Sequence, residues 1–367
     1  MTRLRGGVDY TYIKKKGVFM KKLVQSMATL LMVAGVVGFM GCKQPTGGEP
    51  GQNAKPGTDV ANPEEKPKPD EKNGPKIIRQ DTIAGEKYDI VEFGIWPQTK
   101  YSGEAGLQPC ESINAWDQSV CFTDGTDNYI KVTATPHETC KSEFPDSTYY
   151  FKLEPIQWRV LTNDYKIPDG NGGYKSSNKK LLFAEKALAA HKYHDSSNKY
   201  DTSEIRAYLN GIGDFTDAGF LQKAFTLEQI KAIADTEVDN SALSTTDVGE
   251  NITKATNYVC GNTTDQIFLL SEKEVTTAEY GFDAYDHYVG DSYNTTTSTR
   301  QRKPTDYSKA TGIAVHPNHG SSVFWLRSPY YSHDYNARRV YYDGDPNSYD
   351  DASDTIVGVV PALTMNF

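Results

Sequence analysis

The sequence predicts an α+β, strand-rich fold that forms a single domain. Short segments with strand-like alternation fill residues 78–161. Two segments with helix caps and helical spacing follow at residues 202–210 and 226–233. About 290 residues remain after residue 76, which is enough chain for one well-cored domain. These observations together favour small sheets with a few helices between them.

Strand signals dominate the first half of this domain. Residues 88–93 alternate between apolar and polar side chains, as a half-buried strand does. Residues 149–153 and 156–161 are predicted to be two strands, broken at Glu154-Pro155. Residues 179–184 form a further short apolar segment, which predicts another strand.

Helix signals are concentrated in the middle of the chain. The first helix is expected over 202–210, from a capping residue to the residue before Gly211. The second is expected over 226–233, with Thr226 as its cap and apolar residues at 227, 230 and 233. A buried strand at 267–271, a helix opening at 272–279 and long loops over 286–322 are expected to follow.

The N-terminal part of the chain is typical of an exported lipoprotein. Residues 1–19 are interpreted as a mis-assigned extension, because Met20-Lys21-Lys22 begins a conventional export signal. Residues 20–41 are expected to be a lipoprotein signal peptide, and Cys42, which follows Gly41, its lipidated first mature residue. An incidental Cys in an ordinary signal peptide is the alternative. Residues 42–76, rich in Pro, Gly, Lys and Glu, are expected to form a disordered tether, with the folded domain at 77–367.

Charge and cysteine usage limit the classes of partner and bond. The net charge of −9 and the pI near 5.4 argue against nucleic acid as a partner. Four cysteines follow Cys42, and in an exported chain we expect them to form two disulfides. Buried free thiols are the alternative. The four are Cys110, Cys121, Cys140 and Cys260.

The last 44 residues combine an apolar frame with a run of unusual composition. The frame consists of 324–329 and 356–363, and it encloses the run Tyr330–Thr355, called here the variable run. The run contains no Lys, Glu, Gln, Met or Trp, although Lys and Glu are common elsewhere in the chain. Tyr, Asp, Asn and Ser dominate it, as they dominate antibody paratopes, where Tyr supplies stiff contact area and the polar residues supply adaptable hydrogen bonds.

This composition predicts a ligand-binding surface within a variable region at about 324–363. A polar surface loop between two core strands is the alternative interpretation. In the binding interpretation the aromatic residues act as anchors and the polar residues as specificity contacts, while Arg338 and Asp343 can belong to the frame. The candidate ligand-binding residues are Tyr330, Tyr331, Ser332, His333, Asp334, Tyr335, Asn336, Arg339, Tyr341, Tyr342, Asp345, Asn347, Tyr349, Asp350 and Asp351.

A restriction on codons also accounts for the limited set of amino acids in the variable run. Asn codons carry two adenines and a pyrimidine, and randomising the adenines never yields Lys, Glu, Gln, Met or Trp. With its flanking motifs, Trp325-Leu326-Arg327-Ser328-Pro329 and Gly358-Val359-Val360-Pro361-Ala362-Leu363, the region resembles the variable proteins of diversity-generating retroelements, of the treponemal lipoprotein type. This resemblance implies a surface lipoprotein whose ligand-binding residues are diversified.

A second resemblance concerns the whole domain. The phrases at 93–99, 155–161, 203–210 and 268–274 are similar to those of bacterial envelope domains with the C-type-lectin fold of the formylglycine-generating-enzyme variety. It covers most of residues 78–367 and implies small twisted antiparallel sheets with two flanking helices and long loops.

No metal, cofactor or catalytic residue is expected. His191/His194 and His316/His319 have a spacing that zinc can use, but neither pair has a clear third ligand, and surface histidines are the preferred interpretation. Asp345-Pro346-Asn347 matches the calcium-dependent sugar-binding signatures only in part. No hydrolase, nucleotide or metalloprotease motif is present, and the C-terminal region lacks the cysteine pair of formylglycine-generating enzymes.

The sequence therefore predicts a non-enzymatic lipoprotein of the cell envelope, anchored by lipid and displayed at the outer-membrane surface. Its expected partner is a protein or other cell-surface ligand, with the membrane contacted through the lipid anchor. Two alternatives remain at this stage: an oxidase related to the formylglycine-generating enzymes, and a structural envelope protein without a dedicated ligand.

Overall fold

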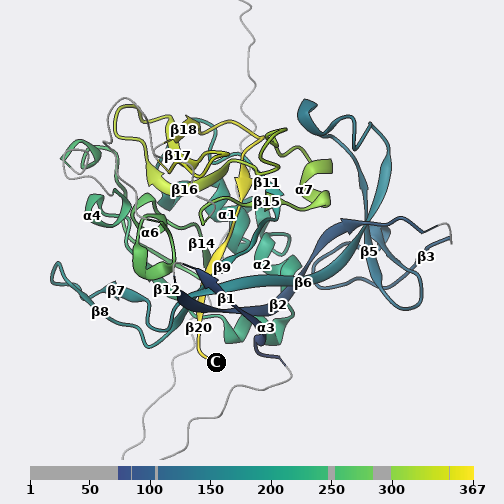
Figure 1. Ribbon diagram of the computed structural model, residues 1–367, viewed down its shortest axis with the longest axis horizontal. Helices are drawn as coiled ribbons and strands as arrows, with labels where there is room; N and C mark the ends of the chain where they lie inside the picture. The colour runs from purple at the N-terminus through teal and green to yellow at the C-terminus, as the bar shows by residue number, and fades with distance from the viewer. Residues whose placement is uncertain (1–72, 84, 104–105, 247–252, 284–298, 347) are drawn as a thin grey trace, which may run out of the picture. The chain divides into compact units, whose positions relative to one another are not determined.

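Mostly antiparallel sheets with short helices between them make up the described part of this computed structural model, and the fold is α+β in class (Figure 1). Residues 73–83, 85–103, 106–246, 253–283, 299–346 and 348–367 are described, all within one compact unit, Lys66–Phe367. The expected extension, signal peptide and lipidated Cys42 lie outside the described residues, as does the expected tether up to residue 72.

The largest sheet has nine strands in the order β14-β20-β9-β6-β5-β4-β3, with β2 pairing with β6 and β1 with β2. All its pairings are antiparallel. The strands are β1 (Lys76–Ile83), β2 (Glu86–Lys100), β3 (Gln108–Pro109), β4 (Cys121–Thr123), β5 (Asn128–Thr133), β6 (Thr148–Thr162), β9 (Lys180–Ala184), β14 (Ile267–Phe268) and β20 (Ala362–Met365).

The long strand β6 corrects the predicted break at Glu154-Pro155. One continuous strand covers both predicted segments. Its first half pairs with β5 up to Lys152, and its second half pairs with β9 from Trp158 onward. Pro155 therefore lies between the two partners, where its missing N–H removes no ladder hydrogen bond on that side. The Gln98 side chain also donates to the Pro155 carbonyl at 2.9 Å.

A second sheet of five strands carries the frame and the variable run. Its order is β11-β19-β16-β17-β18, and the β16–β19 pairing is parallel while the others are antiparallel. Within the variable run, residues 337–342 have the apolar and aromatic side chains of a strand, and β17 begins one residue before this segment and ends two residues before its end. The strands are β11 (Ala189–Ala190), β16 (Phe324–Pro329), β17 (Asn336–Val340), β18 (Ser348–Asp351) and β19 (Gly358–Val359).

Three two-stranded sheets and a set of short helices complete the described fold. The small sheets pair β7 (Lys166–Pro168) with β8 (Tyr174–Ser176), β10 (Lys186–Ala187) with β15 (Lys303–Pro304), and β12 (Thr236–Val238) with β13 (Thr263–Asp265). The helices are α1 (Glu204–Asn210), α2 (Phe220–Ala224), α3 (Leu227–Ala232), α4 (Ala242–Thr245), α6 (Glu272–Val275) and α7 (Asp306–Ala310), with 3₁₀ turns η1 (Gln118–Val120), η2 (Glu138–Cys140), η3 (Tyr200–Thr202), η4 (Gly213–Phe215) and η5 (Ala278–Tyr280).

The two expected helices are present, with corrections in detail. Helix α1 is capped by Ser203, whose hydroxyl accepts from the Arg206 amide, and it ends at Gly211 in a left-handed conformation. Helix α3 has the expected cap at Thr226, completed by Gln229 as a capping box. Its predicted apolar face is wrong at Leu227, which is 76% exposed.

The later expectations over 267–279 are only partly correct. Strand β14 stops at Phe268, although the residues that follow are buried as predicted. Helix α6 ends at Val275 instead of continuing to residue 279, and η5 follows it. In the described part of 286–322, strand β15 and helix α7 interrupt the expected loops.

The expectation of two disulfides is not met, because all four described cysteines are free. Cys140 lies near the Ile313 carbonyl, whereas Cys260 accepts from the Asp201 amide. Cys110 and Cys121 lie on facing chain segments, and the Cys110 amide donates to the Cys121 carbonyl. Burial raises the pKa of all four thiols. Cys121 and Cys140 match the alternative of buried free thiols, whereas Cys110 and Cys260 are only half-buried.

In the described part of the chain, helices long and apolar enough to cross a membrane are absent.

Candidate functional site

The frame strand β16 is buried along its whole length. Trp325 is fully buried, and its indole N–H donates to the His191 carbonyl at 2.8 Å. The Arg327 guanidinium is buried as well, where it pairs with Glu274 and donates to the Leu269 carbonyl at 3.0 Å. This burial leaves β16 without exposed side chains, so the frame supports the variable run from the core.

Most of the candidate ligand-binding residues reach solvent. Tyr335, Tyr341 and Tyr349 are 46%, 39% and 43% exposed, values that are high for large aromatic side chains. The exposed and half-buried candidates together are called here the variable surface. The exposed candidates are Ser332, His333, Asp334, Tyr335, Tyr341, Tyr349 and Asp351. The half-buried candidates are Tyr330, Tyr331, Arg339, Tyr342, Asp345 and Asp350.

Two candidates do not join this surface. Asn336 is only 8% exposed, because it begins β17 opposite Asp351 and is packed beneath the surface. Its assignment as a contact residue is therefore corrected to the scaffold. Asn347 lies outside the described residues. Arg338, which the sequence allowed as part of the frame, is fully buried.

One half of the variable surface is an aromatic cluster. The rings of Tyr330 and Tyr349 are stacked, with centroids 3.8 Å apart and planes at 18°. Tyr331 lies 4.8 Å from Tyr330, and His333 bridges from Tyr330 to Tyr335 with centroid distances of 5.8 and 5.2 Å. Offset aromatic pairs at such distances attract one another and hold the rings in place. The cluster is therefore a preformed aromatic contact area.

A buried ion pair lies beneath this cluster. Arg338 and Glu272 approach to 3.6 Å, and both side chains are 1% exposed. The Arg338 guanidinium also lies over the rings of Tyr330 and Tyr331, at 5.1 and 5.0 Å. Lys254, from outside the run, lies over Tyr331 at 5.3 Å. The buried Arg338 thus contacts the tyrosines from the scaffold side, while Lys254 contacts Tyr331 from an exposed position.

The other half of the variable surface is more polar. Arg339 forms an ion pair with Asp350 and lies 5.2 Å from the Tyr341 ring. Burial raises the pKa of Asp350, and the Arg339 charge opposes this effect in part. Tyr342 packs against Tyr341 and against His316. The pairing of β17 and β18 places these groups side by side.

Asn198 holds the loop before β17 through hydrogen bonds to main-chain atoms of that loop. The Asn198 side-chain amide donates to the carbonyls of Tyr330, His333 and Asn336 at 3.3, 2.9 and 2.9 Å. Its own main-chain N–H donates to the Asp334 carbonyl at 2.7 Å. Because none of these bonds uses a side chain of the run, the side chains can change while the loop keeps its shape. A lone Asn far away in the sequence gave no signal for this role.

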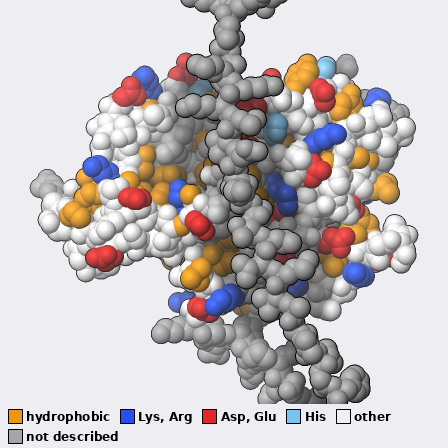
Figure 2. Space-filling model, turned by 180° about the vertical axis from the view of Figure 1, so that it is seen from behind, with side chains coloured by type: hydrophobic (Ala, Val, Ile, Leu, Met, Phe, Trp, Pro, Cys, Tyr) orange, Lys and Arg blue, Asp and Glu red, His pale blue; other side chains and the backbone are white. Residues whose placement is uncertain are grey.

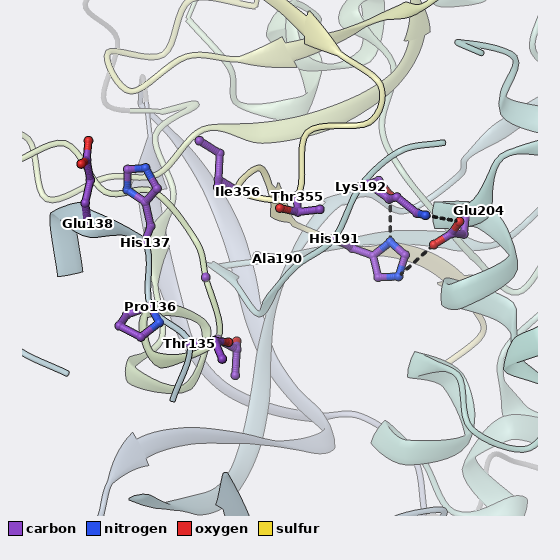
Figure 3. Close-up of a pocket in the computed structure, with 12 residues that line it drawn as sticks. Thr135, Pro136, His137, Glu138, Ala190, His191, Lys192, Glu204, Thr355 and Ile356 are labelled. Atoms are coloured by element: carbon purple, nitrogen blue, oxygen red, sulfur yellow. Dashed lines mark hydrogen bonds and ion pairs between the residues drawn. The ribbon is translucent and has the colours of Figure 1, made fainter. Parts of the chain in front are cut away.

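An open cavity of about 780 Å³ lies beside the C-terminal end of the variable run. His191, Lys192 and Glu204 line one side of it, and His137 and Glu138 the other, with Thr355 between them (Figure 3). Lys192 pairs with Glu204 at 2.9 Å.

The histidines in and near these sites are held by local contacts. His191 stacks on Tyr208 at 4.5 Å, and its Nδ1 lies 2.7 Å from the Lys192 carbonyl oxygen. Burial lowers the pKa of His191. His316 and His319 lie together beside Tyr342, at the border of the variable surface. Groups of three or more metal-ligating side chains are absent from the described residues.

Comparison with known proteins adds one match. The model of a family described as "Domain of unknown function (DUF6273)" matches residues 177–367, which include the frame, the variable run and Asn198. No curated protein and no solved structure matches the chain.

Proposed function

Since the chain belongs to the DUF6273 family, a domain family of unknown function, we propose its function from the site itself. We propose that the chain is a surface-displayed lipoprotein that binds a protein or other cell-surface ligand through the variable surface. In this proposal a retroelement diversifies the residues of that surface. In the same proposal the chain is a variable protein of such a retroelement. Its domain has the C-type-lectin fold, in the version found in the formylglycine-generating enzymes.

One observation carries the proposal. Within the variable run, most of the candidate ligand-binding residues are exposed or half-buried, while Ala337 and Val340 on β17 are buried. A polar loop without a ligand would not need six tyrosines, three of them well exposed. Exposed aromatic side chains on a fixed scaffold are what a binding surface uses for affinity.

The hydrogen bonds of the scaffold favour diversification. Asn198 fixes the loop through main-chain carbonyls, and the buried Arg338–Glu272 pair supports the cluster from below. Substitutions at the exposed positions leave both features intact. A surface diversified at random needs a scaffold that is held by other residues, because a fold that relied on the changing side chains would fail in most variants.

Charge supports a protein or cell-surface partner over nucleic acid. The chain carries a net charge of −9. On the face drawn in Figure 2, basic and acidic side chains are interspersed over the described residues. Nucleic-acid binders instead gather positive charge on one face. We further propose binding without chemical transformation of the ligand, since none of the described cysteines belongs to the variable run.

The genomic neighbourhood of the gene tests diversification. We expect a nearby near-copy of the segment for 324–363, with Asn codons at the variable positions, beside a reverse transcriptase gene. Absence of both would contradict the diversification part of the proposal and leave ligand binding to be tested separately.

Ligand binding is tested by capture of surface proteins with the purified full chain. The triple variant Tyr335→Ser, Tyr341→Ser, Tyr349→Ser is expected to lose or change the captured set. Leu227→Ser removes an even more exposed apolar side chain on α3 and is expected to leave the captured set unchanged. Identical capture by the triple variant and the original chain would refute a binding role for the variable surface.

A further inference from the structure

A hollow of about 400 Å³ lies apart from the variable surface and uses only residues outside the variable run. We call it the tyrosine pocket, because Tyr165, Tyr174 and Tyr280 contribute to its lining. The hairpin β7–β8, helices α4 and α6 and the turn η5 supply most of the lining, and Figure 1 shows β7, β8, α4 and α6 on the same side of the molecule. Arg327 lines the pocket from the frame strand β16, and Asp239 from the segment after β12. Its volume suits one small organic molecule or one terminal residue of a peptide.

The rim of the tyrosine pocket is unusually apolar for an exposed position. Tyr174 on β8 is 50% exposed, and Leu243 on α4 is 59% exposed. A single exposed apolar side chain has no special meaning, but two that flank one hollow indicate a surface that a ligand covers. The occupant should therefore have an apolar body.

The carboxylates of the pocket already have donors. The Tyr165 hydroxyl donates to Glu274 Oε1 at 2.7 Å, and the Ser271 amide donates to Glu274 Oε2 at 2.8 Å. Arg327 forms an ion pair with the same carboxylate. This carboxylate is neutralised and hydrogen-bonded within the protein, so it does not need a cationic ligand.

Asp239 is satisfied in the same way. The Tyr174 hydroxyl donates to its Oδ2 at 2.6 Å, and the Ser241 amide donates to its Oδ1 at 2.8 Å. Both carboxylates therefore already accept hydrogen bonds from the protein, which lowers their capacity to attract a cationic ligand. The ligand class must therefore be sought among molecules that bring acceptors of their own.

The accessible donors of the pocket are lysine side chains. Lys166 already forms an ion pair with Asp164 at 2.5 Å. The Lys273 ammonium lines the pocket from the exposed side and forms no ion pair with the described residues. A pocket with spare donors and engaged acceptors is complementary to an anion.

We propose that the tyrosine pocket binds a small carboxylate that carries an aromatic or branched aliphatic body. The body lies among the tyrosines and Leu243, and the carboxylate is paired with Lys273. The same chemistry occurs in a free organic acid and in the C-terminal residue of a peptide. The site is independent of the proposed variable surface, because it shares none of the variable residues.

Titration of the full chain with 3-phenylpropionate, followed by saturation-transfer NMR and calorimetry, tests the proposal. We expect saturable binding with a Kd on the order of 1 mM or tighter. The probe 3-phenylpropylamine has the same body with the opposite charge, and we expect it to bind at least about tenfold more weakly. Absence of saturable acid binding, or equal binding of acid and amine, would overturn the proposal.

Variants locate the binding. Lys273→Gln is expected to weaken binding of the acid at least about threefold, since one ion pair is lost. Lys231→Gln changes an equally exposed lysine on α3 and should leave the affinity unchanged. Tyr349→Ser should leave it unchanged as well, which separates this site from the variable surface. An unchanged affinity in Lys273→Gln would overturn the placement of the carboxylate.

The two sources are separated with a tripeptide ending in Phe. If its free acid binds more tightly than 3-phenylpropionate and its C-terminal amide does not bind, the pocket takes peptide termini. If the peptide acid binds more weakly than 3-phenylpropionate, the pocket takes free acids. Both results support a carboxylate site and identify its source.

Discussion

The side-chain amide of Asn198 donates to the main-chain carbonyl of Asn336, 138 residues further along the chain, at 2.9 Å. Asn198 is 1% exposed, and its other bonds also reach main-chain atoms of the variable run. One scaffold residue thus fixes the loop that leads into β17, and its hydrogen bonds do not involve the side chains of that loop. Such an arrangement is what tolerance to substitution on the variable surface requires.

Asn198→Asp is expected to loosen this loop. The substitution keeps the size of the side chain but replaces its donating amide by an acceptor, which then faces carbonyl oxygens. We expect the free energy of unfolding to fall by about 1–3 kcal/mol, the cost of leaving buried polar groups unsatisfied. Urea denaturation measures this change, and hydrogen exchange should show faster exchange in residues 330–336.

Asn171→Asp is the matched control for that substitution. Asn171 is exposed in the turn between β7 and β8, so the same chemical change should alter stability by less than about 0.5 kcal/mol. Equal effects of the two substitutions, or unchanged exchange in the loop of Asn198→Asp, would show that Asn198 does not hold the run.

Adjacent residues of the run should respond differently to truncation. Tyr341 is well exposed and Val340 is fully buried in the core. We expect Tyr341→Ala to change the free energy of unfolding by less than about 1 kcal/mol. Val340→Ala should cost about 2 kcal/mol, because it removes buried methyl groups and leaves a cavity. Urea denaturation of both variants checks this, and a larger loss for Tyr341→Ala would contradict a tolerant surface on a fixed scaffold.

Sequence reasoning succeeded where local interactions decide the structure. The caps of α1 and α3 depend on neighbouring residues, and the sequence places them within one residue. The alternation over 88–93 correctly predicts a strand, but β2 continues to Lys100. The exposed tyrosines of the variable run were also predicted, because composition reports on surface chemistry. The continuity of β6 through Pro155 was missed, since it depends on which strands lie on each side.

Long-range partners were beyond the sequence. Asn198 and Lys254 come from segments distant from the run, yet both contact it. Glu272 meets Arg338 only because α6 packs against the frame sheet. Tertiary packing sets such pairs, and no periodicity or motif in one sequence encodes them.

Asp124 gives an expected pH dependence of stability. The Tyr129 hydroxyl donates to Asp124, as do the amides of Thr126 and Asp127. These hydrogen bonds, with the Asp127 amide first, lower the pKa of Asp124 to about 2. The unfolded value is about 3.9. The stabilisation is therefore present above about pH 4 and is lost as the pH falls toward 2.

Thermal unfolding of Asp124→Asn at several pH values checks this. We expect the variant to be less stable than the original chain at pH 6, with the difference shrinking between pH 4 and 2. Asp214→Asn removes an exposed carboxylate that makes no hydrogen bond in the described structure, and it should show no such convergence. A constant difference for Asp124→Asn down to pH 2 would refute the role of the charged form.

Glu274→Gln should be among the most destabilising single changes in the frame region. Arg327 is 1% exposed, and Glu274 forms its ion pair. Removing one partner leaves a buried charge uncompensated, which costs about 3–5 kcal/mol. Glu228→Gln breaks an exposed pair with Lys231 and should cost less than about 1 kcal/mol. Urea denaturation of both variants measures the two losses in free energy of unfolding. Similarly small losses would show that other groups compensate the Arg327 charge.

Gly94 in β2 should not accept a side chain. Its φ of +71° is in the left-handed region, and a Cβ there would lie 2.4 Å from the Phe225 ring and 2.9 Å from the Ala224 carbonyl oxygen. Gly85 has a φ of +91° but no heavy atom within 4 Å of a Cβ. Gly85→Ala therefore measures the backbone cost alone, about 1–2 kcal/mol. Gly94→Ala should add about 1–3 kcal/mol of overpacking, measured as the difference between the two variants in urea denaturation. Equal costs would mean that Phe225 moves aside freely, and that the close packing of β2 on the segment after α2 does not require glycine.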